Sequence, residues 1–169
     1  TGGSTIASIS HAMTESSRWK DLLFIAARGG VGKDVRLQAN TIASLFASKM
    51  NGTYRTLYIP DRLSEEAYMT MKKEPFIQEM MDLYERTNII IHGIGDALEM
   101  AKRRNSSDEE IELLTSRGAV SESFGYYFNN HGEAVHHIRT IGVQLNQLQH
   151  IEHLLAVAGG AKKANALIS

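Results

Sequence analysis

Short aliphatic runs alternate with longer amphipathic stretches along this chain, and that alternation constrains the fold more than any other feature. The strands it predicts lie at residues 21–26, 54–59, 88–92, 138–143 and 154–158. Between them, apolar residues recur three or four positions apart, as in 35–50 and 76–84, which is the spacing of one buried helix face. Strands and helices in this order predict an α/β fold around a mostly parallel sheet.

Length and composition narrow the class of protein. The 169 residues suffice for one packed core and favour a single domain. No apolar run approaches the roughly 18 residues of a membrane span, so no membrane segment is expected. Cysteine is absent, which excludes a disulfide framework, a zinc ribbon and thiol catalysis, and which fits a cytoplasmic protein. The net charge of -1 argues against a dedicated DNA-binding surface, because such a surface needs a concentrated basic stripe.

Several helix boundaries can be predicted from single residues. Pro75 stands where a first helical residue belongs, and Asp96 with Glu99 has the spacing of a helix cap with its reciprocal carboxylate. Gly118 is typical of a helix stop. The residues that follow, near 118–140, are rich in aromatic and turn-forming side chains and predict a small β insertion.

Residues 1–5 form a Gly-rich segment just before a helix face that Ile6, Ile9 and Met13 mark. Such a segment is typical of the turn that follows a strand. We therefore expect the first strand of the sheet to lie upstream of this sequence.

Gly-rich turns occur at residues 2–5, 28–33, 93–95 and 159–163. In a parallel sheet all four would lie at the carboxyl edge of the strands, where such folds bind ligands. Glycines let backbone N–H groups approach an anion, and the N-terminus of a following helix carries partial positive charge. Each turn alone is a weak signal, since glycine also ends strands for steric reasons. Their coincidence predicts a phosphate-binding site.

The turn at 29–33, Gly-Gly-Val-Gly-Lys, resembles the nucleotide-binding loop of certain ATPases. However, Asp34 follows, where that loop needs a Ser or Thr to hold magnesium, and Ala27 stands where it needs a glycine. We therefore do not expect ATP at Lys33. We interpret Asp34 as the cap of the helix that carries Gln38.

Basic residues near these turns are candidates for anion contacts. Arg28 ends a strand, where it either clamps a phosphate or is solvated. Lys163 lies in the first turn of the expected last helix, where a cation is unfavourable unless an anion compensates it. In the trio 102–104, two cations suffice to complement the negative end of their helix, which leaves one arginine available for a ligand.

The sequence offers no evident catalytic apparatus. It has no Gly-x-Ser-x-Gly elbow and no histidine with an evident partner, and no carboxylate cluster completes a metal site. We therefore predict no catalytic residue, no metal and no cofactor. Glu122, within the apolar and aromatic stretch 121–128, is either an edge-strand side chain facing water or an acceptor for sugar hydroxyls.

Six segments together resemble the effector-binding domain of the SorC/DeoR-type bacterial transcriptional repressors, which bind sugars. They are Thr-Gly-Gly-Ser-Thr at 1–5, Ala-Arg-Gly-Gly at 27–30, Gln-Ala-Asn-Thr at 38–41, Gly-Ile-Gly at 93–95, Glu-Ser-Phe-Gly-Tyr-Tyr-Phe at 122–128 and Ala-Val-Ala-Gly-Gly at 156–160. The resemblance covers essentially the whole chain in the expected order. It implies a Rossmann-like α/β fold with helices on both faces of a mostly parallel sheet, related to the sugar-phosphate isomerases and deaminases.

The resemblance also implies which residues hold the ligand. The backbone and hydroxyl groups that would cradle one phosphate belong to Gly2, Gly3, Ser4 and Thr5. Lys163 would make a further phosphate contact. Lys162 is an alternative to it, because the segment at 161–163, Ala-Lys-Lys, departs from the family's pattern of small polar residues before one lysine.

Four more residues complete the implied set. Arg28 and Gln38 would make further phosphate and sugar contacts. Arg103 and Glu122 would bind hydroxyl groups or a second phosphate of the ligand.

Taken as a whole, the resemblance implies that residues 1–169 are the effector-binding domain of a cytoplasmic repressor of glycolytic genes. The expected inducer is fructose 1,6-bisphosphate, with glucose 6-phosphate, fructose 6-phosphate and dihydroxyacetone phosphate as other candidates. Operator DNA would be bound by an N-terminal domain that nothing in this chain resembles. Members of the family assemble, so a homo-oligomer, a dimer or a tetramer, is expected.

A sugar-phosphate isomerase or deaminase on the same fold is the alternative. Such an enzyme needs a positioned acid–base set. The Asp-Gly-Ala-Asp-Glu type segment of the ribose-phosphate isomerases has no counterpart in this sequence. The sequence therefore favours a sensor over a catalyst.

Overall fold

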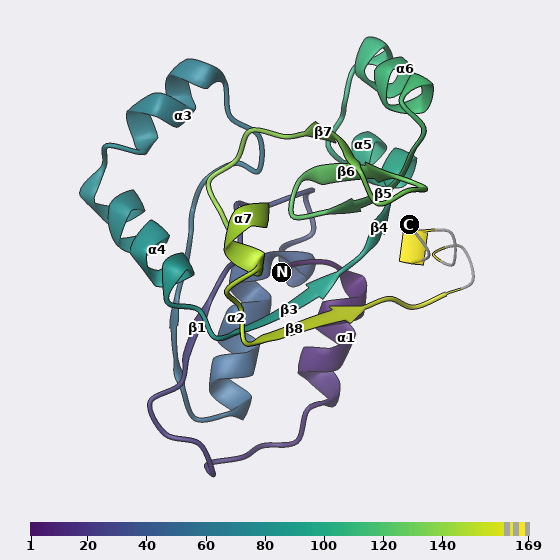
Figure 1. Ribbon diagram of the computed structural model, residues 1–169. Coiled ribbons are helices and arrows are strands. Elements are labelled where there is room, and N and C mark those ends of the chain that lie inside the picture. Colours follow the sequence, from purple (N-terminus) through teal and green to yellow (C-terminus); the bar gives the residue numbers. More distant parts are fainter. Residues whose placement is uncertain (161–162, 164–165, 168–169) are drawn as a thin grey trace.

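The computed structural model describes residues 1–160, 163 and 166–167 and mixes helices and strands along the whole of this range (Figure 1). The helices are α1 (Ser4–Ala12), the 3-10 helix η1 (Val35–Leu37), α2 (Ala39–Lys49), α3 (Glu65–Met71), α4 (Pro75–Glu85), α5 (Ala97–Arg103), α6 (Asp108–Ser116) and α7 (Leu145–Leu148). The strands are β1 (Leu23–Ile25), β2 (Thr53–Arg55), β3 (Ile89–Gly93), β4 (Gly95–Asp96), β5 (Ala119–Ser123), β6 (Tyr126–Asn129), β7 (Ala134–His137) and β8 (His153–Val157). None of these helices has the length and hydrophobicity that crossing a membrane requires.

The strands form two parallel pairs and one antiparallel sheet. β1 pairs with β2, with Leu23 opposite Thr53, and β3 pairs with β8, with Ile89 opposite His153. β4, β5, β6 and β7 lie in that order in a four-stranded antiparallel sheet. The parallel pairs with their connecting helices confirm the predicted α/β class, and the antiparallel sheet confirms the predicted β insertion near 118–140.

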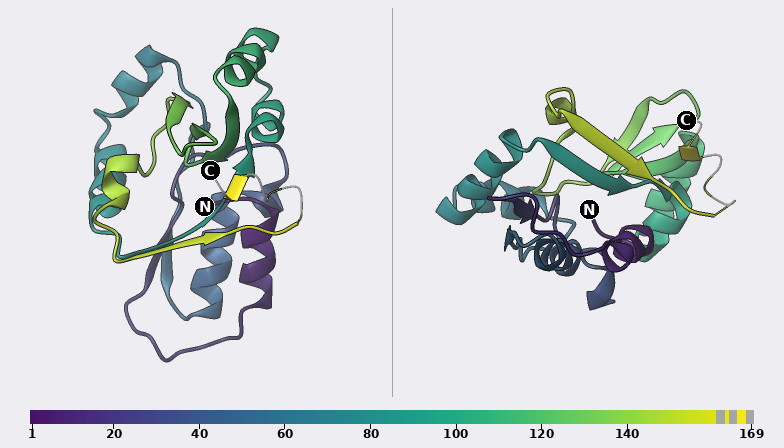
Figure 2. Two further views of the ribbon diagram at one scale, coloured as in Figure 1. Left: turned by 45° about the vertical axis from the view of Figure 1, so that its right-hand side comes forward. Right: turned by 90° about the horizontal axis from the view of Figure 1, so that it is seen from below.

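Helices cover both faces of the parallel strands. α1 and α2 lie side by side along one face (Figure 2), where Ile6 and Ile42 pack with Ile91 of β3. α4 packs on the opposite face, where Ile77 belongs to the same buried cluster as Ile90. Because side chains alternate along a strand, the neighbours Ile90 and Ile91 point into opposite layers.

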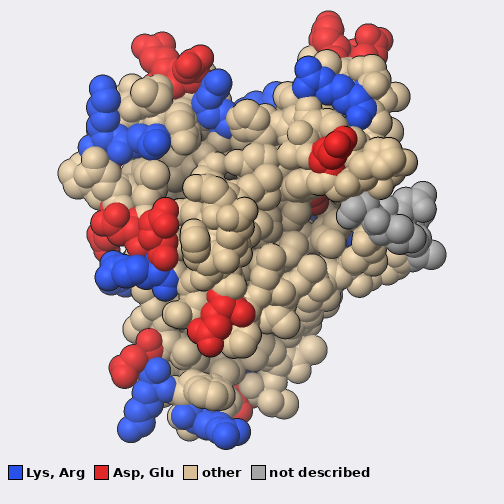
Figure 3. Space-filling model, in the orientation of Figure 1, with Lys and Arg blue, Asp and Glu red and all other residues tan. Residues whose placement is uncertain are grey.

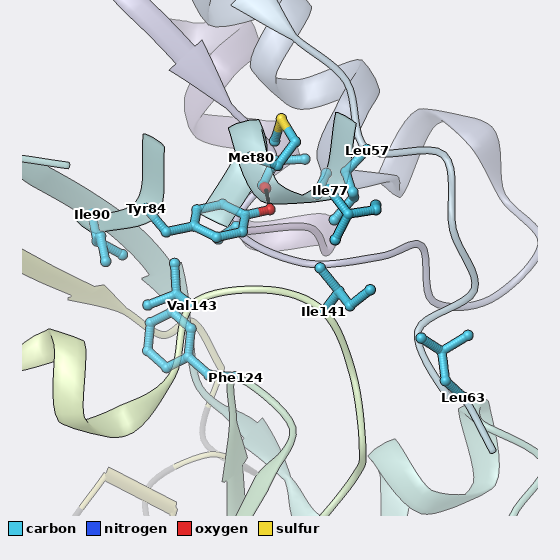
Figure 4. Packing of buried hydrophobic residues seen from close by; sticks show 12 residues of the cluster. Leu57, Leu63, Ile77, Met80, Tyr84, Ile90, Phe124, Ile141 and Val143 are labelled. Carbon is cyan, nitrogen blue, oxygen red and sulfur yellow. Dashed lines mark hydrogen bonds between the residues drawn. The ribbon is translucent and has the colours of Figure 1, made fainter. Parts of the chain in front are cut away.

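The larger cluster of buried side chains connects α4 with β3 and with the loops at residues 57–63 and 141–143 (Figure 4). Its labelled members are Leu57, Leu63, Ile77, Met80, Tyr84, Ile90, Phe124, Ile141 and Val143. Burial of each large apolar side chain contributes about 1.5–3 kcal/mol of hydrophobic free energy. The Tyr84 hydroxyl donates to the Ala26 carbonyl oxygen at 2.8 Å, and burial raises the pKa of Tyr84, so the ring keeps its proton as a donor.

The helix boundaries predicted at Pro75, Asp96 and Gly118 are confirmed. Pro75 is the first residue of α4. The Asp96 carboxylate accepts from the Glu99 backbone N–H at 2.9 Å and caps α5. Gly118 follows α6 with a φ of 67°, in the left-handed region that ends a helix at little cost only with glycine.

The strand predicted at 138–143 is wrong. Gly142 makes only an isolated antiparallel bridge to Arg28, and the Val143 backbone N–H donates to the Ala27 carbonyl oxygen at 2.8 Å. The segment therefore crosses the end of β1 instead of joining a sheet. A Cβ on Gly142 would lie 2.5 Å from the Ala27 oxygen, so the crossing itself requires glycine. The apolar side chains of Ile141 and Val143 still pack in the core, although their backbone forms no strand.

The helix predicted over 35–50 begins at Ala39, because the short helix η1 precedes it. Asp34 is a cap, as predicted, but its carboxylate accepts from the Arg36 backbone N–H and so caps η1. Gln38 is itself the N-cap residue of α2. The strand predicted at 54–59 also ends early, since β2 stops at Arg55.

Replacing Tyr84 by phenylalanine should lower the free energy of unfolding by about 1–3 kcal/mol, because the buried Ala26 carbonyl oxygen loses its donor. Urea unfolding followed by circular dichroism measures this change. Tyr58→Phe is the matched control, since Tyr58 is 81% exposed, and it should change stability by less than about 0.5 kcal/mol. Equal effects of the two substitutions would contradict the role given to the Tyr84 hydroxyl.

Candidate functional site

One cavity lies where the carboxyl ends of β1, β3 and β8 meet, and each of the four Gly-rich turns contributes to its lining. All nine residues predicted for the site line it, namely Gly2, Gly3, Ser4, Thr5, Arg28, Gln38, Arg103, Glu122 and Lys163. The structure therefore brings together residues up to 161 positions apart in the sequence. That they bind a ligand stays a prediction. Lys162 lies outside the described residues.

The turn before α1 offers backbone N–H groups to this cavity. Gly3 is the N-cap residue of α1, with a φ of 107° and no side chain to cap the helix. The N–H groups of Ser4 and Thr5 have no acceptor in the described part of the chain, and they lie at the positive end of the helix. Gly2 lies directly against the end of η1, since a Cβ on Gly2 would lie 2.8 Å from the Leu37 carbonyl oxygen. The arrangement suits a bound anion.

Behind the cavity lies a buried network of two arginines and two carboxylates. Arg28 Nη1 lies 3.2 Å from Glu122 Oε1, and Arg28 Nη2 contacts Asp61 Oδ1. Arg104 donates from Nε to Asp61 Oδ2 at 2.7 Å and from Nη2 to Glu122 Oε1 at 2.9 Å. All four side chains are at most 7% exposed. We call these residues the buried ion network.

Charge balance makes this burial possible. Removing an unpaired charge from water costs several kcal/mol, but here two positive and two negative groups neutralise one another. Burial lowers the pKa of Arg28, opposed by Asp61 and Glu122. Burial also acts to lower the pKa of Arg104, yet Glu122 and Asp61 outweigh it and raise that pKa. Both guanidinium groups therefore remain charged at every physiological pH.

Glu122 occupies β5 but does not face water, so the edge-strand interpretation is wrong. Its Oε1 accepts from Arg28, from Arg104 and from the Gly125 backbone N–H at 2.7 Å. The β5–β6 turn makes this possible, because Phe124 and Gly125 adopt φ values of 54° and 86°. A Cβ on Gly125 would lie 2.7 Å from Arg28 Nη2, so only glycine leaves room for the arginine.

Gln38 holds the turn that separates its helix from β1. Its Nε2 donates to the carbonyl oxygens of Val31 at 3.0 Å and of Gly32 at 2.9 Å. The predicted ligand contact of Gln38 would therefore compete with two hydrogen bonds to the turn.

Two further cations line the cavity without a carboxylate partner among the described residues. Arg103 is exposed at the end of α5, where its Nη1 contacts only Met100 Sδ, at 4.0 Å. Lys163 is half-buried, and its backbone N–H donates to the Gly160 carbonyl oxygen at 3.1 Å. Within the described residues, no carboxylate therefore competes with a bound anion for either side chain.

Sequence reasoning missed Asp61 and Arg104. Asp61 follows Pro60, a dipeptide typical of an exposed turn, and nothing local predicts its burial. Arg104 belongs to the trio 102–104, in which one arginine was expected for a ligand. In the structure two arginines of the trio have such roles. Arg103 lines the cavity, and Arg104 donates hydrogen bonds to Asp61, Glu122 and the Tyr127 hydroxyl. A surplus of cations at the helix end was the only local signal.

A family model described as "Putative sugar-binding domain" matches residues 1–169. The chain belongs to this family. The Central glycolytic genes regulator of Priestia megaterium is 45% identical to this sugar-binding domain over 99% of the chain, and that of Bacillus subtilis is 44% identical over the same share. In each case the match covers 49% of the relative. The chain therefore spans about half the length of the curated relatives it matches.

Solved structures agree with the fold. A crystal structure described as a putative SorC family transcriptional regulator from Enterococcus faecalis superimposes with a TM-score of 0.89 at 44% identity, over 99% of this chain and 68% of that one. The full-length sorbitol operon regulator SorC from Klebsiella pneumoniae gives a TM-score of 0.90 at 14% identity, over 99% of this chain and 56% of that one. The second likeness shows the fold alone. The first likeness agrees with the family resemblance, and both confirm the fold class.

In this sugar-binding domain, Asp61→Asn should lower the free energy of unfolding by about 3–5 kcal/mol, the typical cost of removing one partner from a buried ion pair. The substitution leaves Arg28 and Arg104 buried around a single carboxylate. Guanidinium unfolding gives the measurement.

Glu65→Gln is the control for Asp61→Asn, because Glu65 lies 3.8 Å from Arg139 in an exposed ion pair. It should cost less than about 1 kcal/mol. If Asp61→Asn lowered the free energy of unfolding no more than the control does, the buried ion network would not be needed for the stability of the fold.

Proposed function

We propose that this chain is the ligand-sensing domain of a bacterial transcriptional repressor of glycolytic genes, and that its effector is a phosphorylated sugar which relieves repression. The observation that carries the proposal is the single cavity shared by an anion-binding turn at 2–5 and the buried ion network. The names of relatives 44% and 45% identical support the glycolytic context.

The chemistry of the cavity supports a phosphate. The free N–H groups of Ser4 and Thr5, their hydroxyl groups and the positive end of α1 favour a compact dianion. Lys163 adds a full positive charge from the opposite end of the chain. Charge-assisted hydrogen bonds of this kind are about twice as strong as neutral ones.

The polar groups further inside support a sugar. Glu122 is held in one orientation by three donors, and Gln38 presents an amide to the same cavity. Fixed acceptors and donors of this type select hydroxyl groups by geometry. The ligand we propose therefore carries a phosphate at one end and several hydroxyl groups beside it.

The same residues support sensing over catalysis. Among the described lining residues, Glu122 is the only carboxylate, and no histidine is present. Isomerisation of a sugar phosphate needs a base that can take a proton from carbon. A carboxylate that already accepts from two guanidinium groups is poorly suited to that task. We therefore favour a non-catalytic sensor over an isomerase or deaminase.

Fructose 1,6-bisphosphate is the effector we propose among the phosphorylated sugars. Its two phosphates match two separate groups of anion-binding residues in the cavity. One group is the turn at 2–5 with Lys163, and the other centres on Arg103, which lies beside the buried ion network and has no carboxylate partner among the described residues. Glucose 6-phosphate, fructose 6-phosphate and dihydroxyacetone phosphate would use only the first.

For the whole protein we propose a cytoplasmic homo-oligomer, a dimer or a tetramer, that binds operator DNA through a separate N-terminal domain. Ile89 on β3 and Leu155 on one side of β8 are about half exposed, as is Leu154 on the other side of β8, and the region of these strands carries few charged side chains (Figure 3). Exposed apolar side chains on both sides of β8 support burial of this strand in an assembly or under another segment. Within the described residues β1 pairs only with β2 and β3 only with β8, which supports a further strand at their free edges.

Fructose 1,6-bisphosphate should raise the thermal stability of the protein, since a ligand at a hundred times its Kd adds about 2.7 kcal/mol to the free energy of unfolding. Thermal melts and calorimetric titrations with the four candidate sugar phosphates measure how strongly each one binds and stabilises the protein. No stabilisation by any of them would overturn the proposal. Interconversion of glucose 6-phosphate and fructose 6-phosphate, followed by NMR, would favour the enzyme instead.

Lys163→Gln should weaken sugar-phosphate binding by about tenfold or more, because it removes a charge-assisted hydrogen bond to the phosphate. The matched control is Lys73→Gln, because Lys73 is exposed between α3 and α4 and does not line the cavity. The control should bind like the parent protein. Equal affinities for both variants would remove Lys163 from the site.

A further inference from the structure

A second cavity of about 500 Å³ adjoins the first. Three segments line it: the Gly-rich turn at 30–34, the loop at 60–62 and the end of α5 with the residues after it, 102–105. Both cavities share part of their lining, namely Val31, Leu37, Arg103 and Arg104. The buried ion network forms part of the wall between them, since Arg28 and Glu122 line the first cavity and Asp61 lines the second.

The carboxylates of the second cavity are already neutralised. Asp34 accepts from Arg36 Nε at 3.1 Å and from Arg36 Nη2 at 2.9 Å. Asp61 is held by Arg28 and Arg104 in the buried ion network. Neither carboxylate is therefore available to offset another positive charge in this cavity.

The cations of the second cavity are mostly unpaired. Lys33, Lys102 and Arg103 are exposed, and none has an ion-pair partner within the described part of the chain. Arg62 also lines the cavity, but its Nη2 donates to Glu110 of α6 at 2.6 Å. Arg103 lines both cavities, so Lys33 and Lys102 are the two uncompensated charges that belong to the second cavity alone, and they favour an anion there.

Backbone geometry adds donors to these charges. Gln38 binds the carbonyl oxygens of Val31 and Gly32, and both peptide bonds that follow are trans. In a trans peptide the N–H points opposite to the carbonyl, so the N–H groups of Gly32 and Lys33 point away from Gln38. Neither N–H group has an acceptor among the described residues. Successive N–H groups in such a turn form an anion-binding concavity.

We propose that the second cavity is a separate binding site for a small polyphosphate-bearing anion. Lys33 and Lys102 supply its charge, and the N–H groups of Gly32 and Lys33 supply directed hydrogen bonds. The turn has Asp34 where ATPase loops have their magnesium-binding hydroxyl, so the site takes its anion through cations and N–H groups of the protein. Binding here is distinct from binding of a sugar phosphate in the first cavity.

Inorganic pyrophosphate is the probe for this site. The intact protein is first saturated with glucose 6-phosphate, which carries one phosphate and occupies the first cavity at the turn 2–5, and is then titrated with pyrophosphate in a calorimeter. The double variant Lys33→Ala/Lys102→Ala then separates the second cavity from the remainder of the first. The expected result is a second binding event, with one pyrophosphate per chain. A pyrophosphate signal that glucose 6-phosphate abolishes would overturn the proposal, because the probe would then occupy only the first cavity.

The double variant Lys33→Ala/Lys102→Ala should weaken pyrophosphate binding by about tenfold or more and leave the affinity for glucose 6-phosphate within twofold of the parent. Lys20→Ala/Lys73→Ala removes the same charge from two exposed lysines that line neither cavity, and it should change neither affinity. Equal losses in the two double variants would overturn the proposal, since they would reflect only the net charge of the protein.

The two proposals fail separately. If glucose 6-phosphate does not bind at all, the effector proposal is weakened, while the response of pyrophosphate to Lys33→Ala/Lys102→Ala still decides the second site. Thermal melts of each variant without ligand show whether it remains folded. A folded double variant that binds pyrophosphate like the parent rules out the second site.

Discussion

Two buried arginines and two buried carboxylates are the interaction on which the rest of this structure depends. Arg28 follows β1, Asp61 precedes α3, Arg104 follows α5 and Glu122 belongs to β5. No one of these charges could leave water alone at an acceptable free energy. The parallel strands, α5 and the antiparallel insertion must therefore come together for any of them to be buried. Gly125 and Gly142 lack a Cβ where Arg28 passes, so backbone shape and charge pairing agree.

The ion network also limits the chemistry that the cavity can perform. It holds Glu122 as a fixed hydrogen-bonding group and leaves no free base among the described residues of the cavity. A ligand can shift a conformational equilibrium only through contacts that differ between the two states. The hydrogen bonds of Gln38 Nε2 to the carbonyl oxygens of Val31 and Gly32 would be such contacts for an effector that accepts from Nε2 in their place.

The turn at 29–33 lies between the two cavities and contributes to the lining of both. Its first part lines the cavity with the predicted effector residues, and its later residues line the second cavity beside Lys102. The turn resembles an ATPase loop, but Asp34 and Ala27 depart from that loop and argue against ATP there. Lys33 lines the second cavity and not the first. The lysine of the ATPase-like turn therefore lies on the other side of the turn from the predicted effector residues.

The sequence by itself determined the α/β class, the β insertion near 118–140, the helix caps at Pro75 and Asp96 and the nine residues gathered in one cavity. These follow from periodicity, from glycines at strand ends and from a family resemblance, all of which are encoded over short stretches of chain. Only the tertiary structure decided that Glu122 is buried, that Asp61 and Arg104 complete its environment and that residues 138–143 cross β1 without forming a strand. The physical reason is that burial of a charge depends on partners far away in sequence. Arg28 and Glu122 are 94 positions apart, and no local pattern records that they meet.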